Sequence, residues 1–410
     1  MSNFFSRRRF LQSAGVAAVG IPTSVKGYTA AEMRSFDSAG VMEQDISKWE
    51  LDTPALCVDL DALEANLATL QQTATRNGID SRPHAKTHKT PAIARMQLDG
   101  GSVGICTAKV SEAIAMYEHG IDQILLTTIN ATPYKINQAM NLRRWCPEFI
   151  QATDTPGNAR DLSEAAQAAG LVADVVVDID SGGHRTGITP GRPALELAQL
   201  VDQLPGLQLR GMLCYDGGSQ HVNGFDTRRA RTLERLVPAT ETFDLMQRSG
   251  LSTEIFSGGG TGTYNIDHEV RGLTDIQVGS YVFMDAQYMA IGGASGDVYS
   301  DFENSLTILT TVLNAQYEGG ATTDAGAKAC TINQPWPIVK GETGMTYRSG
   351  SDEFGTLRYD DPSRTYKLGD KLEVIVSHCD PVVNLYDQMY ATRNDRVEAV
   401  WRIAARGMSA

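Results

Sequence analysis

The chain has 410 residues, of which 42% are hydrophobic and 21% are charged, and its formal net charge is −13 at pH 7. This length is sufficient for two domains or for one large barrel with an addition, and the composition is that of an ordinary globular protein. The acidic balance argues against nucleic acid or an anionic membrane as a partner.

Residues 1–30 are predicted to be an export signal rather than part of the fold. Arginines at positions 7–9 precede a Phe-Leu pair, and a mild Ala/Gly/Val run follows at 13–21. That run is too short and too weakly apolar to span a bilayer, and no other stretch is a candidate membrane anchor. The pattern is typical of a twin-arginine signal, with cleavage expected near positions 28–30 and a periplasmic location. A basic disordered tail is the alternative.

The next elements are a polar linker at 31–52, a short strand at 53–58 and a helix from about residue 61 to 76. A regular alternation of strands with helical segments then begins. The candidate strands start near Ser81, Val103, Gln123, Phe149, Ala173, Leu207, Glu254 and Ile276. Eight such units, within residues 53–300, predict a (β/α)8 barrel of the TIM type. A doubly wound parallel sheet would also alternate strands with helices and is the alternative.

The rhythm changes beyond residue 300. The stretches 306–317, 371–377 and 396–403 are β-rich and separated by Gly, Asp and Pro clusters. They predict a second, mostly antiparallel β domain at 301–410. The strand at 53–58 precedes the barrel and is a candidate to pair with that domain.

The six cysteines form no CxxC pair, and several lie inside apolar runs. Although an exported protein permits disulfides, buried free thiols are therefore expected.

The stretch Arg82–Lys89 reads RPHAKTHK. In an extended strand, a period of two would place Arg82, His84, Lys86 and His88 on one face. Like charges and desolvation would then lower the pKa of Lys86, which favours a lysine that forms a Schiff base with a carbonyl. A solvated basic strand end and a His-rich metal loop are the alternatives.

A glycine-rich loop follows the candidate seventh strand. Loops after strands seven and eight commonly form the phosphate site of a barrel, and adjacent glycines let backbone N–H groups surround an oxyanion. The candidate contacts are Ser257, Gly258, Gly259, Gly260 and Thr261 in this loop, and Gln277, Gly279, Ser280 and Tyr281 after strand eight. A flexible turn is the alternative. A Schiff-base lysine together with a phosphate site indicates pyridoxal 5'-phosphate.

Three further polar residues follow strand ends. Arg185 comes after the fifth strand, and Tyr215 and His221 come after the sixth. Such positions in a barrel are catalytic candidates, although either loop could be an ordinary turn.

A candidate metal site lies in the β domain. His378 and Asp380 are two residues apart, so on an extended chain they would face the same way, with Cys379 pointing opposite. Imidazole plus carboxylate suits Mn2+ or Mg2+, with Zn2+ as a further possibility, and water or substrate would complete the shell. A plain turn after a strand is the alternative.

These motifs together resemble the D-threonine aldolase and D-serine dehydratase-like family of fold-type III pyridoxal-phosphate enzymes, which are related to alanine racemase. The resemblance extends from about residue 53 to the C-terminus. It is carried by 82–89, 180–187, Tyr215 with His221, 258–263, 277–285, 324–329 and 378–380.

The resemblance implies an alanine racemase-like barrel with a β domain, and a homodimer. It assigns roles to six residues: Lys86 as the Schiff-base lysine, Arg185 near the ring oxygen of the cofactor or the lysine, Tyr215 against the cofactor, His378 and Asp380 on a divalent metal, and His221 near the substrate hydroxyl.

One departure separates the branches of the family. In the dehydratase branch of the family that this chain resembles, the metal motif is a His-x-Cys zinc pair. Here Asp380 is at the third position of the motif and the cysteine is at the middle one. Carboxylate for thiolate favours a harder ion, so we interpret the chain as a metal-activated aldolase that cleaves D-configured β-hydroxy amino acids to glycine and an aldehyde. The alternatives are a D-serine or D-3-hydroxyaspartate dehydratase and a non-catalytic periplasmic binding protein.

Overall fold

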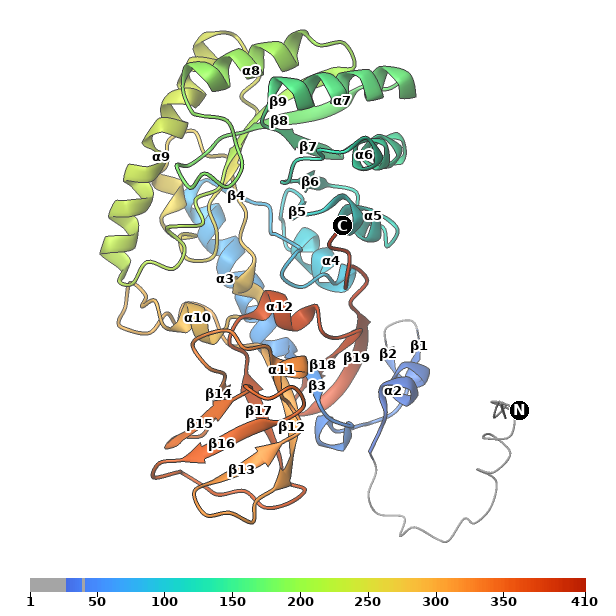
Figure 1. The fold of residues 1–410 in the computed structure, drawn as a ribbon, viewed down its shortest axis with the longest axis vertical. Helices are drawn as coiled ribbons and strands as arrows, with labels where there is room; N and C mark the ends of the chain where they lie inside the picture. The colour runs from blue at the N-terminus through green and yellow to red at the C-terminus, as the bar shows by residue number, and fades with distance from the viewer. Residues whose placement is uncertain (1–26, 39–40) are drawn as a thin grey trace, which may run out of the picture.

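The computed structural model describes residues 27–38 and 41–410, so the arginines at positions 7–9 lie outside the described part. Figure 1 shows two lobes, a helix-covered parallel sheet and below it a β domain. The described part of the chain starts on the β domain, passes through the parallel sheet and returns to the β domain. This arrangement confirms the predicted barrel with a C-terminal β domain.

The barrel consists of eight parallel strands. They are β4 (Asp80–Ser81), β5 (Ile105–Thr107), β6 (Ile124–Leu126), β7 (Ile150–Thr153), β8 (Ala173–Asp178), β9 (Leu207–Cys214), β10 (Ile255–Gly258) and β11 (Asp275–Ile276). The sheet runs from β5 through β9 to β11 and β4. Hydrogen bonds from Val103 N to Ser81 O at 3.0 Å and from Cys106 N to Pro83 O at 2.8 Å join its two ends. Because the ends meet, the doubly wound alternative is wrong.

Helices alternate with these strands. They are α3 (Leu60–Asn77), α4 (Pro91–Asp99), α5 (Val110–Tyr117), α6 (Pro133–Trp145), α7 (Pro156–Ala169), α8 (Arg192–Gln203) and α9 (Phe225–Arg248). Helix α7 shows how local sequence sets the ends: the Thr155 side chain accepts from Asn158 N, Pro156 follows it, and Gly170 closes the helix at φ 66°. After β10 the connection contains only a 3-10 turn, η2 (Asp267–Glu269).

The β domain contains β12 (Leu306–Asn314), β13 (Gly320–Thr323), β14 (Ile338–Val339), β15 (Met345–Arg348), β16 (Gly355–Tyr359), β17 (Lys371–Ile375), β18 (Gln388–Arg393) and β19 (Arg396–Arg402). Strand β3 (Ala55–Asp59) joins them, antiparallel to β12 and parallel to β18. The remaining helical pieces are short: η3 (Ser280–Val282), α10 (Ala286–Met289), α11 (Ala327–Cys330) and α12 (Cys379–Val383).

Residues 31–52 differ from the expected linker. They form α2 (Ala30–Phe36), the strand pair β1 (Asp37–Ser38) and β2 (Val41–Met42), and η1 (Lys48–Glu50). Met33, Ile46 and Leu51 are buried in one cluster with residues of β3, β12, β18 and β19. The many polar residues of this segment concealed its few apolar anchors in the sequence.

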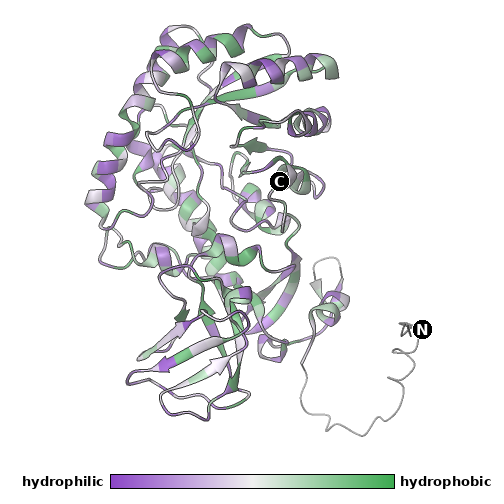
Figure 2. Cartoon of the chain, in the orientation of Figure 1, coloured by the Kyte–Doolittle hydropathy of each residue, from purple (hydrophilic) through white to green (hydrophobic). Residues whose placement is uncertain are grey.

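The core follows the expected partition of side chains. Figure 2 shows the strands of the barrel largely hydrophobic and helices α6 and α9 largely hydrophilic on their outer sides. All six cysteines are free and buried, which confirms the prediction of free thiols. Among the described residues, no helix combines the length and apolar character that crossing a bilayer requires.

The central position of β3 generates a stability prediction. Leu56 is 0% exposed in this strand, so Leu56→Ala should lower the free energy of unfolding by about 2–5 kcal/mol through the cavity it leaves. Urea denaturation of the purified protein measures this change. Leu368→Ala is the control: that side chain is 73% exposed in the β domain, and its loss should cost no more than about 0.5 kcal/mol. Equal losses in the two variants would contradict the placement of β3.

Candidate active site

A cavity of about 740 Å³ opens at the carboxyl ends of the barrel strands, where barrel enzymes carry their active sites. Many of the predicted site residues line it. They are Lys86, Arg185, Tyr215, Gly260, Thr261, Gln277, Gly279 and Ser280. The cavity therefore collects residues from widely separated parts of the sequence.

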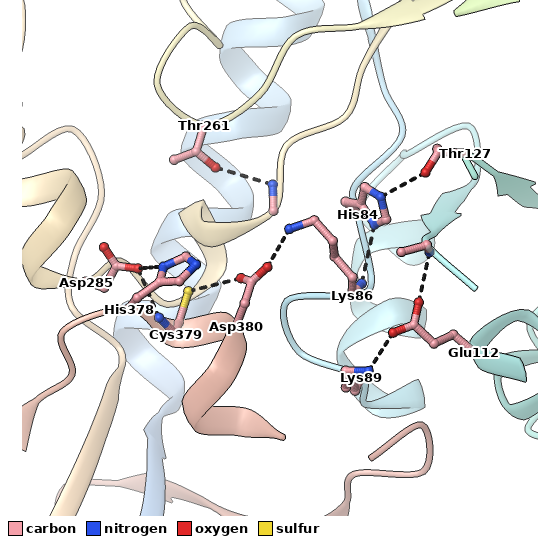
Figure 3. Close-up of polar contacts among 12 residues, drawn as sticks. His84, Lys86, Lys89, Glu112, Thr127, Thr261, Asp285, His378, Cys379 and Asp380 are labelled. Atoms are coloured by element: carbon pink, nitrogen blue, oxygen red, sulfur yellow. Dashed lines mark hydrogen bonds and ion pairs between the residues drawn. The ribbon is translucent and has the colours of Figure 1, made fainter. Parts of the chain in front are cut away.

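Lys86 lies on a turn that follows β4. The prediction of one extended strand through residues 82–89 is wrong, because β4 ends at Ser81 and the backbone then turns, with Lys89 N bonded to Ala85 O at 2.7 Å. Figure 3 shows the Lys86 side chain pointing toward Asp380 of the β domain, with which its Nζ forms an ion pair. The two domains thus meet at this lysine.

The charge environment of Lys86 also differs from the expectation. Burial works against its charged form, but the nearby Asp380 carboxylate prevails and raises the pKa above the ordinary lysine value. His84 adds no charge beside the lysine, because burial and then the Lys86 charge lower the pKa of His84 well below its usual value. The charged group that dominates at Lys86 is therefore an anion. The predicted lowering of the lysine pKa is wrong.

Several residues of the predicted phosphate loop lie behind the cavity wall. The Ser257 hydroxyl donates to Asp275 Oδ1 at 2.5 Å, and the Tyr281 hydroxyl accepts from Gln97 Nε2 at 3.1 Å. Gly258 ends β10, and a Cβ there would lie 2.4 Å from Cys214 O. These three residues do not line the cavity and instead support the loop through contacts on its far side.

The glycines are required by close packing. Gly259 has φ +65°, and a Cβ on it would lie 2.1 Å from Asp267 Oδ2, while a Cβ on Gly260 would lie 2.6 Å from Gln220 Oε1. Burial raises the pKa of Asp267 to about 8, although hydrogen bonds from Thr263 and Gly260 oppose the shift. The loop is therefore folded tightly over a buried carboxyl group.

Hydrogen-bond donors remain available at this end of the cavity. Thr261 Oγ1 accepts from Gly279 N at 3.3 Å and from Tyr281 N at 3.1 Å. Within the described residues, the backbone N–H groups of Thr261 and Ser280 donate to no protein atom. Such free amides and a hydroxyl are the groups that hold a phosphate.

Arg185 and Tyr215, which follow β8 and β9, also line the cavity. The Arg185 guanidinium stands 5.1 Å from the centroid of the Tyr215 ring, within cation–π range. Burial raises the pKa of Tyr215, so its hydroxyl stays protonated. His221 does not line the cavity; it packs against Tyr288, which does, with ring centroids 4.6 Å apart.

The predicted metal residues are arranged differently from an extended chain. Cys379 begins helix α12, and its Sγ lies 3.6 Å from Asp380 Oδ1, so the expectation that Cys379 points opposite is wrong. Asp285, which sequence reasoning did not select, accepts from His378 Nδ1 at 3.0 Å and from Cys379 N at 3.1 Å. Ligand atoms of Asp285, His378 and Cys379 lie within 4.8 Å of one another. The signal that could have identified Asp285 is its place at the end of the motif 277–285, which carries part of the family resemblance.

Asp178 is a second residue that sequence reasoning did not select. It ends β8, lines the cavity and is 3% exposed. Its Oδ2 is buried without a hydrogen-bond partner, and burial raises the pKa of this carboxyl from 3.8 to about 7. The sequence signal that could have identified Asp178 is an acidic residue at the end of an apolar strand.

The fold and the lysine-bearing cavity define an alanine racemase-like barrel. The family profile described as "Alanine racemase, N-terminal domain" matches residues 58–287, and the one described as "Putative serine dehydratase domain" matches residues 305–392. The chain therefore belongs to the D-threonine aldolase and D-serine dehydratase-like family, for which pyridoxal phosphate is the expected cofactor.

Individual relatives agree with this assignment. The chain is 37% identical to a 3-hydroxy-D-aspartate aldolase of Paracoccus denitrificans (strain Pd 1222), over 87% of this chain and 93% of that protein. It is 36% identical to a D-threonine aldolase of an Arthrobacter species, over 88% and 94%. The crystal structure of D-threonine aldolase from Filomicrobium marinum superposes with a TM-score of 0.85 at 37% identity and covers 90% of this chain and 99% of that one.

The buried Asp178 predicts a pH-dependent stability. Between about pH 4 and pH 7 the folded protein retains the proton that the unfolded chain releases, so the contribution of Asp178 to stability falls as the pH rises through this window. Asp178→Asn removes that dependence. Its free energy of unfolding relative to the wild type should rise by up to about 4 kcal/mol from pH 4 to pH 8.

Urea denaturation of both proteins at the two pH values measures this difference. Asp267, whose pKa is also raised, is present in both proteins and cancels in the comparison. A difference that does not change with pH would show that Asp178 ionises normally in the folded state.

Proposed function

We propose that the protein is a metal-activated, pyridoxal-phosphate-dependent lyase that cleaves D-configured β-hydroxy amino acids such as D-threonine to glycine and an aldehyde. The observation that carries the proposal is the contact between Lys86 and Asp380 at the cavity. It brings the candidate cofactor lysine and the candidate metal residues to one place. The aldolases among the relatives support the same reaction class.

Pyridoxal phosphate fits the groups that the cavity presents. Lys86 supplies a primary amine, while Thr261 and Ser280 supply free backbone donors for a phosphate. When bound, the cofactor would supply an electron sink for the carbanion left by Cα–Cβ cleavage. Lys86 would hold it covalently, and the donors of the glycine loop would orient its phosphate.

A divalent metal fits the residues at the edge of the β domain. Asp285 occupies His378 Nδ1, which leaves Nε2 of that imidazole as the nitrogen available to an ion. Asp380 lies in the first turn of α12, which His378 caps, and offers a carboxylate. We propose His378 and Asp380 as ligands, with Mn2+ or Mg2+ preferred to Zn2+ because of the carboxylate.

His221 is the proposed base for the substrate hydroxyl. Desolvation lowers its pKa below the usual histidine value, so the imidazole is neutral at pH 7 and can accept a proton. Its ring packs on Tyr288 at the cavity edge. A base and a metal on one side of the cavity would act on a hydroxyl presented from that side, which would select the D configuration at Cα.

A dehydratase of D-serine or D-3-hydroxyaspartate is the second candidate. The observation in its favour is Cys379, whose thiol lies with the Asp285 and His378 ligand atoms in one cluster. An imidazole with a thiolate is a typical zinc pair. Burial raises the pKa of the Cys379 thiol well above its usual value, so it binds an ion only if the ion displaces the proton.

The reaction is tested with purified protein that is stripped by a chelator and resupplied with pyridoxal phosphate and Mn2+. D-threonine should give glycine and acetaldehyde, L-threonine should give neither, and activity should vanish without the metal. Lys86→Ala should abolish covalent attachment of the cofactor, seen as loss of a visible absorbance band that borohydride bleaches in the wild type.

Other outcomes identify the alternatives. D-serine converted to a 2-oxo acid and ammonia would assign a dehydratase, and full activity in chelator would remove the metal from the mechanism. A wild type that binds cofactor but converts none of the three amino acids would favour a binding protein. Asp380→Ala should weaken metal binding and also alter the cofactor absorbance, because Asp380 contacts Lys86.

The proposed location is the periplasm, reached through the twin-arginine pathway, and the proposed assembly is a homodimer.

The folded part includes residues 28–30: Thr29 caps α2, and Asp52 N donates to Tyr28 O at 2.9 Å. We therefore move the proposed cleavage to a position before Tyr28.

Replacing Arg7 and Arg8 together by Lys should stop export, because the signal depends on paired guanidinium groups. Fractionation and immunoblotting should then find the unprocessed protein in the cytoplasm. Replacing Lys26 by Arg, outside the arginine motif, is the control and should leave export unchanged. Normal periplasmic accumulation of the Arg7/Arg8 variant would refute the twin-arginine assignment.

A further inference from the structure

A chain of polar side chains leads from the barrel wall to the cavity. Arg82 Nε lies 3.1 Å from Asp275 Oδ1, Ser257 Oγ lies 2.5 Å from the same oxygen, and Gln277 Nε2 lies 3.0 Å from Ser257 Oγ. All four residues are buried. Of the four, Gln277 alone lines the cavity.

The donors and acceptors along this chain have one consistent direction. The Asp275 carboxylate is paired with Arg82 and can only accept, so the Ser257 hydroxyl donates its proton to it. The oxygen of Ser257 then remains as an acceptor toward Gln277. The side-chain amide of Gln277 must therefore turn its NH2 group to Ser257.

This orientation leaves the carbonyl oxygen of Gln277 for the cavity. Within the described part of the chain, Oε1 accepts no hydrogen bond, and it is not among the buried atoms that lack a partner. A neutral amide could in principle present either end to a ligand. Here the network selects the accepting end.

We propose that Ser257 and Asp275 are positioning residues that fix the Gln277 amide so that its carbonyl oxygen accepts a hydrogen bond from the protonated ring nitrogen of pyridoxal phosphate. The inference rests on the proposed function. The phosphate and phenolate oxygens of the cofactor only accept hydrogen bonds. Its ring nitrogen lies opposite the carbon that joins the lysine and donates once it is protonated.

The arrangement has a consequence for the reaction. A protonated ring nitrogen makes the cofactor a stronger electron sink, which suits cleavage of a carbon–carbon bond. Gln277 would stabilise that protonated form without adding a negative charge to the cavity. Ser257, which sequence analysis assigned to the phosphate, acts here through Gln277.

The test uses the full-length protein loaded with cofactor that carries nitrogen-15 at the ring position. The nitrogen chemical shift reports protonation directly and independently of activity. The wild type should show a protonated ring nitrogen at neutral pH. Gln277→Glu, which keeps an acceptor, should retain this signal, and Gln277→Met, of similar length but without an amide, should lose it.

The positioning role has its own matched pair. Ser257→Ala lets the amide rotate and should lower the midpoint of ring-nitrogen protonation by about one pH unit, a tenfold loss of proton affinity. Ser257→Thr keeps the hydroxyl and should leave the midpoint in place. Thermal unfolding of each variant checks that it is folded. The nitrogen shift of the wild type tests the protonation of the ring nitrogen even if a variant does not fold.

Two results would overturn the inference. One is an unprotonated ring nitrogen in the wild type. The other is a signal that Asp178→Asn changes and Gln277→Met does not, since Asp178 also offers an unpartnered oxygen to the cavity. Failure of the protein to form the visible cofactor band would instead reject the proposed function, and this inference with it.

Discussion

The ion pair between Lys86 and Asp380 is the contact on which the site depends, because it joins the barrel to the β domain at the cavity. Because the Lys86 side chain is partly exposed, water screens the attraction between the two charges, and the pair favours the placement in which the groups are in direct contact. The lysine comes from the turn after the first barrel strand and the carboxylate from the start of α12. Neither domain alone contains a complete site.

The turn that carries Lys86 is held from behind by the end of the chain. Lys89 takes a left-handed conformation with φ 53°, its Nζ lies 2.5 Å from Glu112 Oε1, and its carbonyl accepts from Ala405 N at 3.1 Å. Figure 1 shows the C-terminus returning from β19 to the barrel beside α4 and α5. The β domain therefore contacts the lysine turn at two points, through Asp380 at Lys86 and through the C-terminal tail at Lys89.

Buried carboxyl groups support the other parts of the site in a similar way. Asp267 lies under the glycine loop, Asp285 holds the imidazole of His378, and Asp275 directs the Ser257 hydroxyl. None of the three lines the cavity. Each holds the orientation of a neighbouring group, which is the usual task of groups behind a binding site.

The sequence by itself determined the repeating architecture. Apolar runs marked all eight barrel strands within a few residues, because periodicity is a local property of the sequence. The residue types in the motifs likewise indicated a lysine, a phosphate loop and a metal pair. Local pattern could not show that residues 31–52 pack on the β domain through a few apolar anchors.

Only the tertiary structure decided which groups meet. It turned Tyr281 and Ser257 away from the cavity and brought Asp178 into it. It also placed Asp285 against His378, and it set the Asp380 carboxylate, an anion, beside Lys86 where the sequence predicted further cations. The prediction of one extended strand through residues 82–89 was wrong for the same reason, since the backbone turns between Ala85 and Lys89, where Lys86 pairs with the distant Asp380. A pKa and a ligand set depend on distances across the fold, and spacing along the chain does not contain those distances.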